Sequence, residues 1–193
     1  MADLRTHEWH RRPQLAHAFF ATQRLAHKCT YNYTPKDIGM DLRDIMNSDA
    51  VRFSSHTSCK KRLLQDISEQ AASVYGLNAQ EVLSALTERE RLGSTGVGKG
   101  VAIPHARFNG LDRVYGFFTR LEKPVDFDAV DREPVDLIFT ILAPEKEGAE
   151  HLKALALVSR TFRSESTCAK LRSNADSSTL YALLTQLDTI QAA

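Results

Sequence analysis

The sequence feature that most constrains the fold is the run Val135–Leu142, in which every residue except Asp136 and Thr140 is apolar. Pro134 precedes this run and Pro144 follows it closely, and proline is confined to the boundaries and edges of sheets. A short, almost continuously apolar run between such breaks is typical of a strand that is buried on both faces. We therefore predict a central strand here, in a sheet that other elements cover on both sides.

Helical patterns lie on both sides of this strand in the sequence. Ser58 is expected to cap a helix over residues 59–75, which Gly76 ends, and Asn78 to cap the next helix, which stops at Gly93. The other predicted elements are a short helix over 41–46, strands over 50–53 and 114–121, the second of them ended by Pro124, and helices over about 147–163, 165–173 and 176–187. Helices on both sides of a sheet predict an α/β (α+β) fold of three layers, an α/β/α sandwich.

Four glycines crowd into the segment before His105, at positions 93, 96, 98 and 100. Glycine lets the backbone bend sharply, and successive free N–H groups in such a loop can form a nest for an anion. The hydroxyls of Ser94 and Thr95 would add donors to this nest. Val101–Ile103 predicts a short buried strand, after which Pro104 stiffens the backbone that carries His105. A loop of donors beside a fixed imidazole suits a phosphoryl group that a ring nitrogen attacks.

Other interpretations of these residues compete with this one. A nucleotide-binding P-loop is rejected, because Gly100 occupies the position of the magnesium-binding Ser or Thr and because the segment follows a helix and precedes a strand. An ordinary glycine turn beside a surface histidine stays open from the residues alone. A zinc site formed by His105 and His151 lacks a third ligand at suitable spacing, so we expect no metal. Four acidic residues are expected to be turn and edge charges: Asp126, Asp128, Asp131 and Asp136.

The segment Leu86–His105 resembles the active-site segment of type 2 enzyme IIA domains of the bacterial phosphotransferase system, the fructose/mannitol-type and nitrogen-regulatory group. The resemblance continues through Pro124–Ala129, Pro134–Leu137 and His151–Ala156, and it covers about residues 40–190. It implies a three-layer sandwich around a small mixed β-sheet. The nitrogen-regulatory branch fits best, because one IIA domain stands here without a fused IIB or membrane part.

The resemblance also implies roles for individual residues. His105 would accept the phosphoryl group on Nε2, which a backbone carbonyl could favour by holding Nδ1–H. Arg89 would be the stabilising cation and His151 would donate a hydrogen bond to the phosphoryl group; the alternatives are a solvated helix-end charge and a structural histidine. Lys99 and Arg107 flank the site and could instead meet an acidic partner. The local phosphate-binding donors are expected at Ser94, Thr95, Gly96, Gly98 and Gly100.

The function that the resemblance implies is phosphoryl transfer by an enzyme, a phosphotransferase component that works through a phosphohistidine and needs no cofactor. The donor would be an HPr- or NPr-type histidine phosphocarrier, and the phosphorylation state would regulate target proteins such as transporters or sensor kinases. Two alternatives stay open: a sugar-specific IIA that passes the phosphoryl group to a IIB cysteine, and a regulatory binding module without phosphoryl turnover. The presence of His105, Arg89 and His151 argues against the second alternative.

Composition argues against several other classes of protein. The formal net charge is +1 for 193 residues, which gives no electrostatic case for a nucleic-acid partner. No apolar run approaches the roughly 18 residues of a membrane span, so we expect no membrane insertion. Cys29, Cys59 and Cys168 have neither the spacing of a disulfide framework nor that of a metal site. A cytoplasmic location is therefore expected.

Residues 1–39 differ from the rest of the sequence. They are basic, rich in histidine and without helical or alternating periodicity, and they lack the apolar core and cleavage site of a secretory signal. We predict a flexible N-terminal extension, followed by a type 2 IIA domain over residues 40–190. If the extension is an upstream in-frame reading, Met40 is the physiological start.

Overall fold

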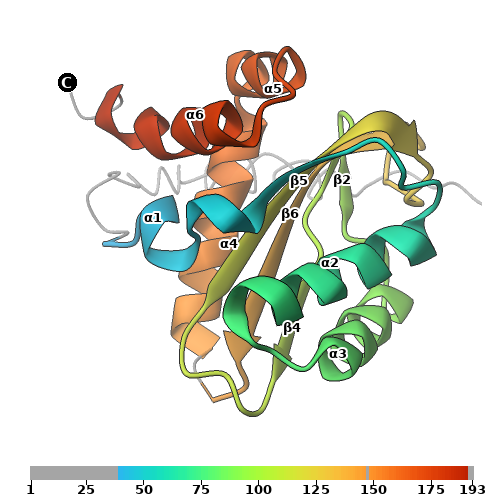
Figure 1. Cartoon of the computed structure of the whole chain (residues 1–193), viewed down its shortest axis with the longest axis vertical. Helices are drawn as coiled ribbons and strands as arrows, with labels where there is room; N and C mark the ends of the chain where they lie inside the picture. Colours follow the sequence, from blue (N-terminus) through green and yellow to red (C-terminus); the bar gives the residue numbers. More distant parts are fainter. Residues whose placement is uncertain (1–38, 147, 191–193) are drawn as a thin grey trace, which may run out of the picture. The chain divides into compact units, whose positions relative to one another are not determined.

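The computed structural model describes residues 39–146 and 148–190, with side chains described up to residue 186. The elements, in chain order, are α1 (Leu42–Ile45), the 3-10 helix η2 (Ser48–Ala50), β1 (Val51–Ser54), α2 (Lys60–Tyr75), α3 (Ala79–Arg91), β2 (Gly96–Gly98), β3 (Val101–Ala102), β4 (His105–Phe108), β5 (Tyr115–Val125), β6 (Val135–Pro144), α4 (Gly148–Arg163), α5 (Glu165–Arg172) and α6 (Ser177–Ile190) (Figure 1). The predicted extension lies outside the described residues except for Gly39, as does Cys29, so its flexibility stays a prediction. Within the described residues, no helix combines the length and the hydropathy needed to cross a membrane.

Strand β6 is the centre of the sheet, as the apolar run predicts. Its residues are all buried except Asp136, which is half-buried. β6 pairs antiparallel with β5 along one edge, while β3 and β4 both pair parallel with its other edge. β1 pairs parallel with β5, and β2 pairs antiparallel with β3, which gives the order β1-β5-β6-β3-β2. The expected small mixed sheet is confirmed.

Helices cover both faces of this sheet (Figure 1), with α2 and α3 on one face and α4, together with α1 and α6, on the other. Two neighbouring phenylalanines of β5 show the division, because successive side chains of a strand point to opposite faces. Phe117 packs against Tyr75 of α2 with ring centroids 5.2 Å apart, whereas Phe118 packs against Phe162 of α4 with centroids 5.7 Å apart. The predicted three-layer α/β/α sandwich is therefore confirmed.

Local capping signals predict some helix boundaries correctly. The Asn78 side chain accepts hydrogen bonds from two backbone N–H groups at the start of α3, and Gly76 ends α2 with a φ of 67°. The predicted cap at Ser58 is wrong, since Cys59 is the N-cap of α2 and its side chain makes no capping hydrogen bond. Capping is a short-range interaction, so a one-residue error moves the cap without changing the helix.

The predicted end of the second strand at Pro124 is also wrong. β5 runs on to Val125, with a register shift between Arg120 and Val125. Proline cannot donate a hydrogen bond to a neighbouring strand, and an irregularity of this kind removes the need for one. The strand can therefore pass through Pro124.

The glycine segment forms a β-hairpin instead of the open anion nest predicted for it. Lys99 and Gly100 join β2 to β3 with φ values of 55° and 74°, and positive φ at both central residues is typical of a type I′ hairpin turn. The Lys99 N–H donates to the Asp131 carboxylate at 2.7 Å. Gly96 is required by packing, because a Cβ atom there would lie 2.8 Å from the Cα atom of Ala129. These glycines allow close chain packing and a tight turn.

Gly96→Ala should therefore destabilise the domain. The added methyl group would overlap the Ala129 backbone, and overpacking of this kind costs about 1–3 kcal/mol of unfolding free energy. Urea unfolding measures the loss, with Gly39→Ala as the control because, among the described residues other than its chain neighbour, no atom lies within 4 Å of a Cβ at position 39. An unchanged unfolding midpoint for Gly96→Ala would contradict the close packing of the hairpin.

Candidate functional site

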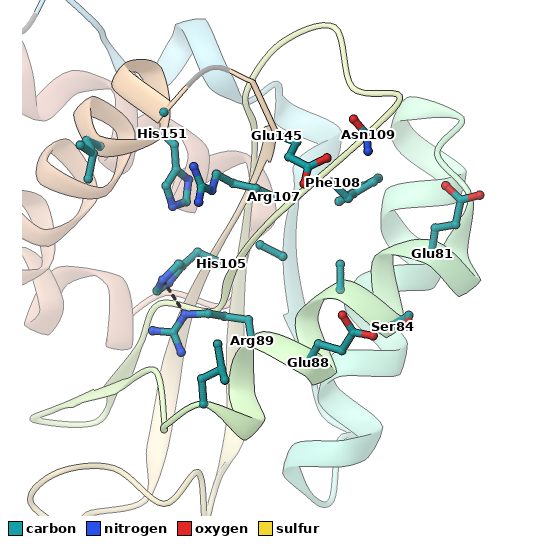
Figure 2. A pocket seen from close by; sticks show the side chains of 15 residues that line it. Glu81, Ser84, Glu88, Arg89, His105, Arg107, Phe108, Asn109, Glu145 and His151 are labelled. Carbon is teal, nitrogen blue, oxygen red and sulfur yellow. Dashed lines mark hydrogen bonds between the residues drawn. The ribbon is translucent and has the colours of Figure 1, made fainter.

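A cavity of about 1030 Å³ opens between α3, β4 and the start of α4 (Figure 2). Arg89 lines it from the last turn of α3, His105 and Arg107 line it from β4, and His151 lines it from the first turns of α4. Three elements that are separate in the sequence therefore direct two imidazoles and two guanidinium groups into one space.

Both ring nitrogens of His105 have a hydrogen-bond partner. Nδ1 lies 2.8 Å from the carbonyl oxygen of Ile103, and Nε2 lies 2.9 Å from Nε of Arg89. A carbonyl only accepts and a guanidinium only donates, so the network assigns the proton to Nδ1 and the lone pair to Nε2. The carbonyl of Pro104 accepts from the N–H of Ile141 at 2.9 Å, which anchors this short segment to β6. The contacts thus select the tautomer that carries its proton on Nδ1 and leaves the lone pair on Nε2.

Arg89 makes a second contact that fixes its guanidinium. Nη1 donates to the carbonyl of Gly93 at 2.9 Å, while Nε faces His105. A guanidinium has five N–H donors in a rigid fork, so these two bonds leave donors that can bind oxygen atoms close to Nε2. Arg89 is half-buried and held in place, which distinguishes it from a solvated charge at a helix end.

The His151 ring lies next to the His105 ring, with ring centroids 5.5 Å apart. His151 is only 8% exposed, and its Nδ1 has no hydrogen-bond partner among the described residues. Burial, and then the neighbouring His105, Arg107 and Arg89, lower the pKa of His151 to about 4. A neutral imidazole with a buried unpartnered nitrogen is suited to hydrogen-bond a group that enters the cavity.

The two other cations that flank the segment have different positions. Arg107 follows His105 by two residues in β4, so both side chains emerge on the same face of the strand. Figure 2 shows the Arg107 guanidinium beside the His151 ring. Lys99 instead lies in the hairpin turn, where its Nζ pairs with Glu165 at 2.5 Å, and it does not line the cavity. Only Arg107 of these two can act inside the cavity.

The five predicted phosphate donors of the glycine segment do not line the cavity: Ser94, Thr95, Gly96, Gly98 and Gly100. The Ser94 hydroxyl donates to the Phe127 carbonyl at 2.8 Å, and the Thr95 hydroxyl donates to Glu90 at 2.6 Å. The three glycines belong to the hairpin. In the described part of the chain, no group of three or more His, Cys, Asp or Glu side chains is arranged to hold a metal ion. The structure therefore gathers His105, Arg89 and His151 without the glycine segment.

The family of the chain is shown by its similarity to known proteins. Residues 44–187 match the profile of the family described as phosphoenolpyruvate-dependent sugar phosphotransferase system, EIIA 2. The chain belongs to this family. The match confirms the resemblance of the active-site segment, and it identifies the chain as a phosphotransferase component.

This IIA domain is similar to several nitrogen regulatory proteins. The one from Bradyrhizobium diazoefficiens is 41% identical over 145 residues, which are 75% of this chain and 95% of the relative. The one from Escherichia coli K12 is 38% identical over 156 residues, which are 80% of this chain and 96% of the relative. The crystal structure of nitrogen regulatory protein IIA-Ntr from Neisseria meningitidis has 36% identity and a TM-score of 0.70, covering 75% of this chain and 99% of that chain. The comparison confirms the fold.

One wall of the cavity is a polar face of α3 for which no role was predicted from the sequence. Glu81, Ser84 and Glu88 line the cavity together with Arg89. Their spacing of three and then four residues places them on one side of the helix, away from the buried Val82 and Leu86. That polar stripe is the signal from which this wall could be predicted.

Phosphoryl acceptance by this IIA domain should persist below the ordinary histidine pKa of 6.5. Burial lowers the pKa of His105 and the Arg89 charge adds to the lowering, although the hydrogen bond to Ile103 opposes both. Because Nε2 stays unprotonated to lower pH than an ordinary imidazole does, the fall in rate with decreasing pH should occur at lower pH than an unshifted histidine would give. NMR titration of the His105 ring checks this direction by comparing the titration midpoint in the folded protein with that in the urea-unfolded protein. An equal or higher midpoint in the folded protein would contradict the expected direction.

Proposed function

We propose that this IIA domain is the phosphohistidine carrier of a nitrogen-type phosphotransferase system, and that Nε2 of His105 accepts the phosphoryl group from an HPr- or NPr-type carrier. The observation that most supports this is the hydrogen bonding of His105, in which the Ile103 carbonyl holds Nδ1–H while Arg89 faces Nε2. A neutral imidazole with a fixed lone pair is a competent nucleophile near pH 7. The cavity beside it gives a donor protein's phosphohistidine room to approach.

In the transfer step, the Nε2 lone pair forms a new P–N bond while the P–N bond to the donor's histidine breaks. The electron pair of the broken bond stays on the donor's nitrogen, and the proton on Nδ1 of His105 stays hydrogen-bonded to Ile103. The Nε–H of Arg89 leaves Nε2 and turns toward a phosphoryl oxygen. Phosphoryl transfer depends mainly on such positioning and on stabilising charge on oxygen, so no cofactor is required.

The other cavity residues complete the stabilisation. His151 would donate a hydrogen bond to the phosphoryl group through its unpartnered Nδ1, in the tautomer that carries a proton there. Arg107 would add a second guanidinium, two residues beyond the acceptor on the same strand. Two guanidinium groups match the nearly divalent charge of a phosphoryl group near neutral pH.

The relatives favour the nitrogen-type role over sugar uptake. Nitrogen regulatory proteins are 38% and 41% identical over 80% and 75% of this chain, whereas the fructose-specific EIIA component of Haloferax volcanii is 39% identical over 56% of it. In the nitrogen-type role, the domain would regulate target proteins, such as transporters or sensor kinases, by its phosphorylation state. A sugar-specific IIA would instead pass its phosphoryl group to a IIB cysteine.

Incubation with phosphoenolpyruvate, enzyme I and an HPr-type carrier, followed by intact mass spectrometry, tests the proposal. We expect a mass increase of one phosphoryl group that is labile in acid and stable in alkali. Addition of a fructose- or mannitol-type IIB domain then separates the two roles, since rapid discharge would favour sugar uptake. Absence of any mass increase would overturn the proposed function.

A further inference from the structure

A buried carboxylate lies directly behind the residues that surround His105. Glu90 follows Arg89 in the last turn of α3, and its side chain is only 7% exposed. Oε1 accepts a hydrogen bond from the backbone N–H of Thr95 at 2.9 Å, and Oε2 accepts one from the Thr95 hydroxyl at 2.6 Å. Glu90 thus holds Thr95 by two bonds, one to the backbone and one to the side chain.

Thr95 connects this carboxylate to the imidazole. Its carbonyl accepts from the N–H of Ile103 at 2.9 Å, and the carbonyl of Ile103 accepts from Nδ1 of His105 at 2.8 Å. The two ring nitrogens of His105 are therefore tied to two adjacent residues of α3. Nε2 contacts Arg89 directly, and Nδ1 is linked to Glu90 through Ile103 and Thr95.

The ammonium group of Lys60 in α2 compensates the negative charge of the Glu90 carboxylate and also contacts it directly. Its Nζ lies 3.0 Å from Oε1 of Glu90, 2.9 Å from the Asp128 carboxylate and 3.1 Å from the Phe127 carbonyl, to which it donates. An ammonium has three donors, so these contacts can use all of them. A buried carboxylate that is paired and fully hydrogen-bonded can stay ionised and hold a single geometry.

We propose that Glu90 is a positioning residue for phosphoryl transfer at His105. Its two bonds to Thr95 fix the peptide of Ile103, whose carbonyl selects the Nδ1–H tautomer, and they hold the end of α3 so that Arg89 meets Nε2. Glu90 touches no reacting atom and acts through Thr95 and Ile103. The inference rests on the proposed function for its effect on rate, whereas its effect on the His105 ring is independent of that function.

Glu90→Gln tests the proposal, because the amide keeps one acceptor oxygen but presents N–H donors where Thr95 also donates. We expect phosphoryl transfer to slow about ten- to a hundredfold, as positioning errors near 1 Å do in other enzymes. We also expect nitrogen-15 NMR of the His105 ring to show a mixture of tautomers in place of the single Nδ1–H form. Glu69→Gln, which neutralises an exposed carboxylate of α2, is the matched control and should leave both measurements unchanged.

Thr95→Ser and Thr95→Val form a second pair that does not alter the buried charge. Serine keeps the hydroxyl that donates to Glu90, while valine keeps the shape and loses the donor. The serine variant should keep the wild-type rate and tautomer, and the valine variant should behave like Glu90→Gln. This pair decides the matter if Glu90→Gln fails to fold.

A single Nδ1–H tautomer in both Glu90→Gln and Thr95→Val would overturn the proposal, because Glu90 would then be only a structural ion pair. This holds even if either variant melts at a lower temperature. Wild-type transfer rates in both variants would overturn it as well. If the wild-type protein accepts no phosphoryl group, the proposed function fails, and the tautomer of His105 still tests the role of Glu90.

Discussion

His105→Ala should abolish phosphoryl acceptance and leave the domain folded. The His105 ring is half-buried and lines the cavity instead of the hydrophobic core, so alanine removes the nucleophile without opening a hole in the core. The substitution loses the hydrogen bond that the ring donates to the Ile103 carbonyl, worth about 0.5–1.5 kcal/mol of net stability, and the one that it accepts from the charged Arg89, worth about 1.5–3 kcal/mol. We expect no mass increase in the assay with enzyme I and an HPr-type carrier, and a modest decrease in Tm.

His151→Ala is the matched control for this experiment. It removes the second imidazole of the cavity while Nε2 of His105 stays in place. The control protein should be phosphorylated more slowly but to completion. A phosphoryl group on His105→Ala, or none on His151→Ala, would contradict the assignment of His105 as the acceptor.

Arg89→Ala should have the second-largest effect, slowing acceptance about ten- to a hundredfold. A hydrogen bond from a charged donor is worth about 1.5–3 kcal/mol, and about 1.4 kcal/mol is tenfold in rate when the bond forms only in the transition state. Loss of the guanidinium should also raise the pKa of His105, because the Arg89 charge lowers that pKa in the wild type. Rapid-quench kinetics measures the rate, and NMR titration measures the pKa.

Two further variants make the Arg89 result specific. Arg89→Lys keeps the charge but loses the planar fork, so its rate should fall between the wild type and Arg89→Ala. Arg91→Ala removes an exposed cation at the same end of α3 and should transfer at the wild-type rate. Equal rates in Arg89→Ala and Arg91→Ala would show that Arg89 has no specific role in transfer.

Much of the fold could be predicted from the sequence because its signals are local. The apolar run in β6 predicts a central strand, and Asn78 and Gly76 mark helix ends through contacts within one turn of the backbone. Pro124 misled the prediction, because whether a proline ends a strand depends on the register of the neighbouring strand. The register depends on contacts between segments that are distant in the sequence, so it cannot be predicted from the residues of one segment.

The candidate site also has a part that could be predicted from the sequence and a part that depends on long-range contacts. Resemblance located His105, Arg89 and His151 in the sequence, and the structure shows that they line one cavity. The glycine segment shows where local signals are ambiguous, because glycines with positive φ suit an anion nest and a tight hairpin equally well. The pairing of β2 with β3 and the packing of Gly96 against Ala129 involve residues that are not adjacent in the sequence, so they could not be predicted from the glycines alone.

The strand is interrupted at Ile103 and Pro104, between β3 and β4. Ile103 falls in this gap. Its N–H still donates to the Thr95 carbonyl, one residue before β2, whereas its carbonyl accepts from Nδ1 of His105. In an unbroken strand, the Ile103 carbonyl would pair with a neighbouring strand, so sheet continuity and the His105 tautomer compete for the same carbonyl. Pro104, which has a fixed φ and no N–H to donate to a neighbouring strand, follows Ile103 in this gap. The break in the sheet therefore leaves the Ile103 carbonyl to accept from the His105 ring and so to select its tautomer.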